Sequence, residues 1–296
     1  MKNYKLKGYI SGIIASVSYG TNPLFALPML SRGICVNSVL FYRYFFAVII
    51  YGLWLSLYKK ISLKISLKEF GILFILGIIF SFSSLFLFDA FNYMESGLAC
   101  TILFAYPLMV TFISKFIFKE QISGIVWLAL FMVLLGISFL YTGKPDGSLS
   151  IKGVALVLLS SLSYAIYMVG IKQIKAIKHL KADKLTFYIM LLGLSVYIWN
   201  LDLCTKLQPL NDWITIVCAI MLALFPTIIS LESISIGIKL IGPVKIAILG
   251  ALEPLTALFF GVILFKEVLT VKIILGITLI LLGVIFVITH KRKTIV

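Results

Sequence analysis

Residues 107–120 read PLMVTFISKFIFKE, and residues 254–267 read PLTALFFGVILFKE. Each stretch begins with a proline inside an apolar run and ends in Phe-Lys-Glu, and the two stretches lie 147 positions apart. The same offset places Gly136 on Gly283. The chain of 296 residues therefore contains an internal repeat of about half its length.

The repeat also includes the beginning of each half. An offset of 145 positions aligns lysine, glycine, serine and tyrosine residues of the two halves: Lys7, Gly8, Ser16, Ser18 and Tyr19 fall on Lys152, Gly153, Ser161, Ser163 and Tyr164. The first and the last spans of each half therefore both belong to the repeat.

The composition excludes a soluble domain. Hydrophobic residues make up 61% of the chain, charged residues make up 12%, and the mean hydropathy is +1.13. Soluble domains are about 45–50% apolar and about 25% charged. At about 20 residues for each span, ten spans leave no room for a soluble catalytic domain. We therefore expect an integral membrane protein.

Ten apolar runs predict ten transmembrane helices. The last run is apolar on every face, as a membrane helix is, whereas the strands of a β-barrel would alternate. The expected fold class is all-α integral membrane, with helices at residues 8–30, 38–58, 70–92, 97–118, 123–141, 152–172, 185–201, 213–238, 242–265 and 270–289.

These helices form two expected domains, a first five-helix repeat over residues 1–142 and a second over residues 150–291. Because five is an odd number, the second unit enters the bilayer from the opposite side, so the repeats are inverted. Two inverted halves can exchange conformations, and a site between them then faces each side of the membrane in turn. The layout predicts alternating-access transport.

The basic residues predict the orientation. The net charge is +15, and with the N-terminus inside, 19 lysine and arginine residues fall in inner segments and 7 in outer ones. Inner segments of membrane proteins carry such an excess. We expect a multi-pass protein of the cell (inner) membrane with both termini cytoplasmic. The charge indicates topology and not nucleic-acid binding.

Several kinds of chemistry lack their sequence motifs. The sequence has no P-loop for ATP and no glycine-rich dinucleotide turn. Its four cysteines, at positions 35, 100, 204 and 218, form no CxxC motif and indicate neither a disulfide framework nor a metal site. The intramembrane polar residues form no nucleophile–base pair. We expect neither an enzyme nor a bound cofactor.

The chain resembles the drug/metabolite transporter (DMT) superfamily, EamA type, over nearly its whole length. The resemblance is carried by the repeated Phe-Lys-Glu, by LEPLTALFFGVILFKE at 252–267, by GITLILLGVIFV at 276–287 and by Arg43 in FYRYFFAVIIYGLWL at 41–55. It implies a ten-helix inner-membrane carrier, commonly an exporter of amino acids or other small metabolites, with a pocket between the halves. The motifs identify the fold and not the cargo.

Glu253 is the first candidate for the substrate site. It lies near the middle of the run at 242–265, where a charged side chain is unfavourable unless it faces a partner, a cavity or water. Pro254 removes a backbone donor beside it and is expected to loosen the helix there. Two interpretations stand: a contact for a substrate amine or a coupling proton, and a structural carboxylate bonded to a neighbour.

The other pathway candidates are polar or aromatic residues inside predicted spans: Glu232, Arg43, Asn22, Tyr19, Tyr106, Tyr164 and Tyr167. Each also has a structural interpretation. Glu232 can be a satisfied carboxylate near the interface, Arg43 can form an ion pair or snorkel outward instead of clamping a substrate carboxylate, Asn22 can mark a kink, and the tyrosines can simply be packed.

Four further residues are expected to be structural or gating: Pro107, Glu120, Pro254 and Glu267. The two glutamates end equivalent spans of the two repeats. We expect each carboxylate to bond the N-terminus of the following helix, where free amide donors and the positive end of the helix dipole meet it.

The predicted function is a secondary transporter that exports amino acids or other small metabolites. The alternative is a channel-like or lipid-handling membrane protein without gradient coupling. The expected partners are a small-molecule substrate, the lipid bilayer and protons as a candidate coupling ion; a homodimer is compatible with the sequence. Both histidines fall in inner segments, so a coupling proton would be carried by Glu253 or Glu232.

Overall fold

A computed structural model describes residues 2–90, 92–94, 96–140, 150–265 and 270–289, and the structure in these ranges is helical without a strand. The first half contains α1 (Lys2–Gly20), α2 (Asn22–Leu30), α3 (Val36–Leu53), α4 (Leu67–Ala90), α5 (Ser96–Leu103), α6 (Tyr106–Phe112) and α7 (Gly124–Leu140). The second half contains α8 (Ile151–Gln173), α9 (Ala182–Asn200), α10 (Trp213–Ala223), α11 (Ser230–Ile241), α12 (Pro243–Leu249), α13 (Leu252–Phe265) and α14 (Val271–Thr289).

Short irregular turns join some of these helices. Three π-helical turns, η1 (Trp54–Tyr58), η2 (Ile113–Ile117) and η4 (Leu224–Ile229), continue α3, α6 and α10, and a 3₁₀ turn, η3 (Lys175–Ile177), follows α8. A π-helical turn widens the helix locally and often marks a functional position.

The ten predicted spans are confirmed. Nine helices or helix pairs in the described residues are long and apolar enough to cross a membrane, and the shorter apolar helix Gly124–Leu140 supplies the tenth. Each one coincides with an apolar run identified in the sequence. The protein is therefore an all-helical, multi-pass membrane protein built from two repeats of five spans.

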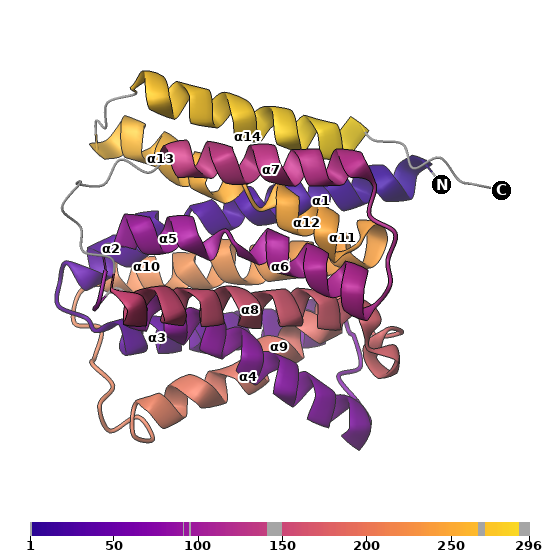
Figure 1. Ribbon diagram of the computed structural model, residues 1–296. Coiled ribbons are helices and arrows are strands. Elements are labelled where there is room, and N and C mark those ends of the chain that lie inside the picture. The colour runs from indigo at the N-terminus through magenta and orange to yellow at the C-terminus, as the bar shows by residue number, and fades with distance from the viewer. Residues whose placement is uncertain (1, 91, 95, 141–149, 266–269, 290–296) are drawn as a thin grey trace.

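The helices run back and forth between two faces of the bundle. Helix α1 begins and α14 ends on the same side, which we call the terminal face; segments 59–66, 118–123 and 174–181 also lie there (Figure 1). Segments 31–35 and 201–212 lie at the other side, which we call the distal face (Figure 1).

The two halves interlock, because helices of one half pack on helices of the other. Helix α1 packs along α11 and α13, and α4 packs between α8 and α9. Helices α7 and α14 approach closely: a Cβ added at Gly136 would lie 2.7 Å from the Gly276 carbonyl oxygen, and one added at Gly276 would lie equally close to the Gly136 carbonyl oxygen. Glycine at both positions lets the two backbones touch.

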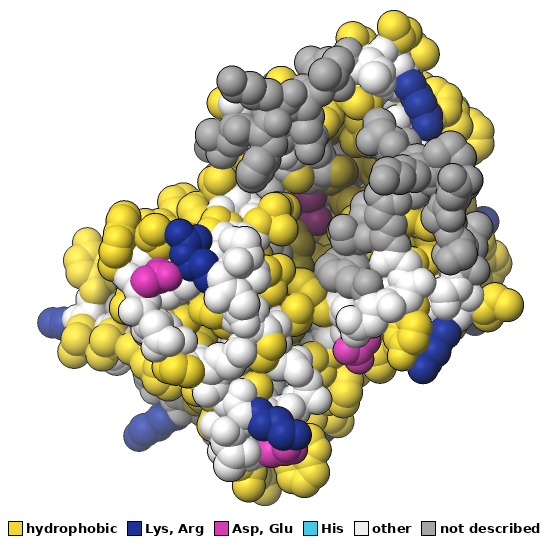
Figure 2. Space-filling model, turned by 90° about the vertical axis from the view of Figure 1, so that its left-hand side faces the viewer, with side chains coloured by type: hydrophobic (Ala, Val, Ile, Leu, Met, Phe, Trp, Pro, Cys, Tyr) yellow, Lys and Arg dark blue, Asp and Glu magenta, His cyan; other side chains and the backbone are white. Residues whose placement is uncertain are grey.

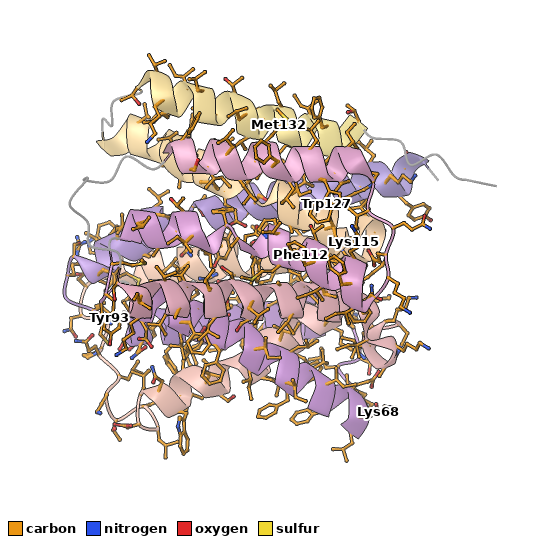
Figure 3. The ribbon with its side chains drawn as sticks, viewed as in Figure 1. Lys68, Tyr93, Phe112, Lys115, Trp127 and Met132 are labelled. Carbon is orange, nitrogen blue, oxygen red and sulfur yellow. The ribbon has the colours of Figure 1, made fainter. Side chains whose placement is uncertain are left out.

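Aromatic and basic side chains anchor the bundle toward its two faces. Toward the terminal face, the Lys115 amine lies 5.1 Å from the centre of the Trp127 ring, which Phe112 meets edge to face (Figure 3). Toward the distal face, the Lys152 amine lies 4.4 Å from the centre of the Tyr93 ring (Figure 3). Such amphipathic groups favour the boundary between lipid and water.

Three spans are interrupted in their interior. The breaks fall at Thr21 between α1 and α2, at residues 104–105 between α5 and α6, and at residues 250–251 between α12 and α13. The last two breaks are equivalent in the two repeats, since 147 positions separate Tyr106 from Glu253. The first break has no counterpart, because α8 is continuous.

The break near Glu253 differs in position from the prediction. The chain leaves the helix before Glu253, at residues 250–251, and Pro254 lies in the first turn of α13. Pro107 lies in the first turn of α6 in the same way. Proline is favoured there because amide groups of the first turn have no intrahelical partner. Both prolines therefore start a half-helix and do not loosen its middle.

Candidate functional site

Glu253 lies where the interrupted spans meet. It is the second residue of α13, and its side chain is half-buried. Gly20, the last residue of α1, packs directly against it, since a Cβ at Gly20 would lie 2.6 Å from the Glu253 carbonyl oxygen. The Tyr106 hydroxyl fills the space beside Gly250, where an added Cβ would lie 1.8 Å from it. These glycines allow α1 and α6 to close around Glu253.

Three tyrosines lie within electrostatic range of the Glu253 carboxyl. Tyr19, Tyr106 and Tyr164 all interact with it electrostatically. The Tyr106 and Tyr164 rings meet edge to face, with centroids 4.8 Å apart. A carboxylate among aromatic faces and hydroxyls suits a cationic group, which ring faces attract and oxygen atoms accept as a hydrogen-bond donor. We call Glu253 and these three tyrosines the central cluster.

The distal face is hollowed. Figure 2 shows this face with an acidic side chain inside the hollow, surrounded mainly by hydrophobic side chains. The half-buried state of Glu253, Tyr19 and Tyr164 agrees with an opening toward the central cluster. At membrane depth, polar side chains and interrupted backbone are stable only where they face protein or a water-filled cavity.

Arg43 is buried beside the central cluster. It is 2% exposed, and its guanidinium carbon lies 5.4 Å from the centre of the Tyr19 ring. Its Nε donates to Thr227 Oγ1 at 2.6 Å, and its Nη2 donates to the Pro226 carbonyl at 2.9 Å. Within the described residues it forms no ion pair. In this structure a hydroxyl and a backbone carbonyl stabilise the charge inside the protein.

The backbone around Pro226 departs from a regular α-helix, and the Ser230 amide donates to the Phe225 and Thr227 carbonyls instead of the Pro226 carbonyl. Pro226 has no amide hydrogen, so it donates no bond to the Leu222 carbonyl. The Thr227 hydroxyl donates to that carbonyl instead, at 2.7 Å. The helix widens into η4 here, and the Pro226 carbonyl accepts from Arg43. Two consecutive residues of the second half, Pro226 and Thr227, therefore bind an arginine of the first half.

Glu232 lies apart from the central cluster, toward the terminal face. Its carboxylate is 3.5 Å from the Lys59 amine, which also contacts Asp183 at 2.9 Å. Lys59 comes from the first half of the chain, and both carboxylates come from the second. These contacts agree with the interpretation of Glu232 as a carboxylate that is paired near the interface. The sequence alone could not show its partner.

A family model described as the EamA-like transporter family matches residues 6–142 and 151–289. The chain belongs to the EamA-like transporter family. The two matched stretches correspond to the two five-span units of the fold. An EamA-like transporter moves solutes across a membrane, so the protein is a membrane transporter.

Curated relatives of this EamA-like transporter carry the same general description. An uncharacterized transporter of Haemophilus influenzae is 21% identical over 266 residues, which are 88% of this chain and 85% of the relative. One of Archaeoglobus fulgidus is 30% identical over 190 residues, 64% of this chain and 66% of the relative. The uncharacterized transporter YdfC of Bacillus subtilis is 28% identical over 104 residues, and the match spans 35% of this chain and 34% of that protein.

A solved structure shares the fold. A crystal structure described only as that of a protein superposes with a TM-score of 0.79 at 16% identity, covering 94% of this chain and 95% of the other. This likeness agrees with the arrangement of the EamA-like spans described above.

The remaining predicted residues fall outside the central cluster. Asn22 begins α2 beside the first break and is half-buried. Tyr167 is fully buried, with its ring centroid 4.6 Å from that of Phe80. Glu120 accepts a hydrogen bond from the Gln173 side-chain amide at 2.7 Å, so its expected bond to the start of α7 is replaced by one to the end of α8. Glu267 lies outside the described residues.

Several residues of this EamA-like site were not identified from the sequence. Thr227 and Pro226 bind Arg43, and Lys59 and Asp183 bind Glu232. A proline followed by threonine inside a span is a signal for the first pair. No local signal identifies the second pair, because lysine and aspartate at span ends are common. Within the described residues no group of three histidine, cysteine or acidic residues could hold a metal ion.

Proposed function

We propose that this transporter is a secondary carrier that works by alternating access and exports amino acids or other small zwitterionic metabolites. The observation that supports this proposal is the central cluster: Glu253 stands half-buried at the start of a half-helix, with three tyrosines within electrostatic range of its carboxyl. The carboxylate accepts the amino group of the cargo, and the tyrosines bind the rest of it.

A proton is the proposed coupling ion, and Glu253 is its carrier. A carboxyl in this position exchanges a proton for a cationic substrate group, because it cannot hold both and is disfavoured as an unpaired charge in the membrane interior. On one side of the membrane the site then releases a proton and binds the cargo. On the other side it releases the cargo and binds a proton. The charge distribution of the sequence assigns the terminal face to the cytoplasm, so the hollow of the distal face opens outward.

The test is transport by the purified protein in liposomes. A mixed panel of radiolabelled amino acids, amines and nucleosides is offered with and without an imposed pH gradient. We expect saturable, gradient-driven accumulation of one zwitterionic class. Glu253→Gln keeps the size of the side chain and removes its charge, and we expect it to abolish gradient-driven accumulation.

The control is Asp202→Asn, which removes an exposed carboxylate paired only with Lys206 four residues later. Such a pair contributes about 0–1 kcal/mol to stability, so transport should be unchanged. Equilibration of solutes that does not saturate would support the channel-like alternative. Gradient-driven accumulation that survives Glu253→Gln would show that another group carries the proton.

A further inference from the structure

Three buried tyrosine hydroxyls complete no hydrogen bond of standard geometry within the described residues, although each faces a polar side chain. They belong to Tyr44, Tyr51 and Tyr167, whose side chains are 0%, 1% and 0% exposed. A buried hydroxyl without a partner is destabilising, and each such group in a native structure requires an explanation. Tyr51 and Tyr167 lie between the central cluster and the terminal face. Tyr44 lies at the level of the cluster, with its ring centre 6.0 Å from the Arg43 guanidinium carbon.

These tyrosines continue a line of polar groups. Tyr44, Tyr51 and Lys59 are spaced by seven and eight residues, which places them on one side of α3 and its continuation. The Tyr51 hydroxyl faces Glu232 without completing a hydrogen bond. On the opposite helices, the Tyr167 hydroxyl faces Ser235 in the same incomplete way.

Two more hydroxyls join the line from α9 and α11. Ser235 and Thr186 are both 0% exposed, and their side-chain oxygens lie 3.1 Å apart. We call Tyr44, Tyr51, Tyr167, Thr186 and Ser235 the hydroxyl strip. Five hydroxyls between α3, α8, α9 and α11 are far more than close packing of a membrane interior requires, since apolar residues would fill the same volume without unpaired donors.

The ion pairs of Lys59 close the end of the strip. Asp183 lies three residues before Thr186, and Glu232 lies three residues before Ser235, so each carboxylate shares a helix face with a hydroxyl of the strip. Lys59 lies between the two carboxylates and joins the two halves of the chain. The Lys59 amine also covers the Trp54 ring, at 4.0 Å from its centre.

We propose that the hydroxyl strip is the closed half of the translocation path and that Lys59, with Asp183 and Glu232, is its gate at the terminal face. This inference rests on the proposed alternating-access cycle. When the halves separate at this face, water and the cargo supply the partners that the hydroxyls lack. The path then suits a polar cargo with a cationic group. The hydroxyl oxygens accept hydrogen bonds from that group, and Asp183 and Glu232 attract it once Lys59 has moved.

The test measures access to the strip without any cargo. A cysteine-free variant carries Ser235→Cys, is placed in lipid nanodiscs and is treated with N-ethylmaleimide. In this background the new thiol is expected to react slowly, because Ser235 is buried. Adding Lys59→Ala should raise the labelling rate about tenfold, by shifting the population toward the open gate. Asp183→Asn is the second gate variant and should act in the same direction.

Two controls separate a gate from general loosening. Ser160→Cys is equally buried but bonds to Ser83 between α4 and α8, outside the strip. Lys68→Ala removes an exposed lysine of the same face (Figure 3). We expect the labelling of Ser160→Cys to stay slow in the gate variants, and Lys68→Ala to leave Ser235→Cys protected.

The inference is overturned if folded gate variants leave Ser235→Cys as slow as in the parent. It is also overturned if Ser160→Cys accelerates to the same extent. Because labelling requires no cargo, faster labelling together with absent transport would overturn the proposed function and leave the path supported. Coupled transport together with unchanged labelling of Ser235→Cys in the gate variants would support the proposed function and overturn the proposed gate.

Discussion

Arg43 shows how a guanidinium is held inside a membrane protein without a carboxylate. Its five N–H donors need acceptors, and in the bilayer interior water does not supply them. The structure provides the Thr227 hydroxyl and the Pro226 carbonyl, both from the other half of the chain. The Tyr19 ring covers the guanidinium within cation–π distance. Arg43 thereby connects α3 to η4 and to the central cluster.

Replacing Arg43 by lysine is expected to destabilise the protein although the charge is kept. One ammonium group cannot reproduce the planar fork that reaches both acceptors. Hydrogen bonds to charged groups contribute about 1.5–3 kcal/mol each, so we expect a loss of about 2–4 kcal/mol. Thermal unfolding in detergent measures it. The control Arg32→Lys changes an exposed arginine paired with Asp212 and should leave the midpoint unchanged; equal midpoints for both variants would contradict the prediction.

A side chain at position 250 is expected to displace Tyr106. The Tyr106 hydroxyl lies 1.8 Å from where a Cβ would be, so Gly250→Ala must displace the ring from the central cluster. Overpacking of this kind costs about 1–3 kcal/mol, and we expect transport to fall with it. The double variant Gly250→Ala with Tyr106→Phe removes the clashing oxygen and should recover part of the stability. If the stability changes of the two single variants simply add in the double variant, as measured by thermal unfolding, the clash between the new Cβ and the Tyr106 hydroxyl is not the cause of the destabilisation.

At this scale the sequence predicted some residues of the site and not others. Glu253, Tyr19, Tyr106 and Tyr164 were found because a polar group at membrane depth is rare and stands out. Lys59 was missed, since its partners come from distant parts of the chain and its position at a span end looks ordinary. The acceptors of Arg43 were missed for another reason: one of them is a carbonyl, which every residue has.

At the scale of elements, the half-helices place the site. Helices α6 and α13 both start at mid-span with a proline in the first turn, at equivalent points of the two repeats. The sequence predicted the paired prolines but not the side on which each helix breaks. That side depends on residues 104–105 and 250–251, where Tyr106 must fit against Gly250.

The α7–α14 pair is expected to depend on its glycines. Gly276→Leu places a side chain where the Gly136 carbonyl lies 2.7 Å from the Cβ, so the helices must separate. We expect a lower yield of monodisperse protein and a loss of about 1–3 kcal/mol in stability. Gly71→Leu is the matched control, because nothing lies within 4 Å of its Cβ position. Size-exclusion chromatography and thermal unfolding compare the two, and similar behaviour would show that close approach is not required.

At the scale of the whole molecule, the apolar runs predicted the ten spans, and the internal repeat predicted their grouping into two units. It did not predict that the units interlock through α1 with α11 and α4 with α8. Contacts between halves depend on which apolar faces match, and the spans are apolar on most faces, so their sequences do not distinguish one neighbour from another. For the same reason the ion pairs between Lys59 and the second half, which we propose as a gate, are visible only in the fold.

The orientation of the bundle decides to which side of the membrane its hollow opens. The excess of lysine and arginine predicts that the terminal face is cytoplasmic, so native Cys35, exposed in the distal segment 31–35, should face outward. In intact cells, a membrane-impermeant maleimide should label a variant that retains only Cys35. A cysteine-free variant with Ser62→Cys, exposed in the terminal segment 59–66, should react only after permeabilisation.

The reverse labelling pattern would show that the bundle has the opposite orientation in the membrane. The hollow that leads toward the central cluster would then open to the cytoplasm, and Lys59 with its two carboxylates would close the outer face. With the predicted pattern, the described conformation agrees with the proposed state that releases cargo outward, because ion pairs that join the two halves lie between Glu253 and the terminal face. In the proposed cycle, return to the loading state requires those pairs to break, so each transport cycle would include the breaking of the Lys59 contacts.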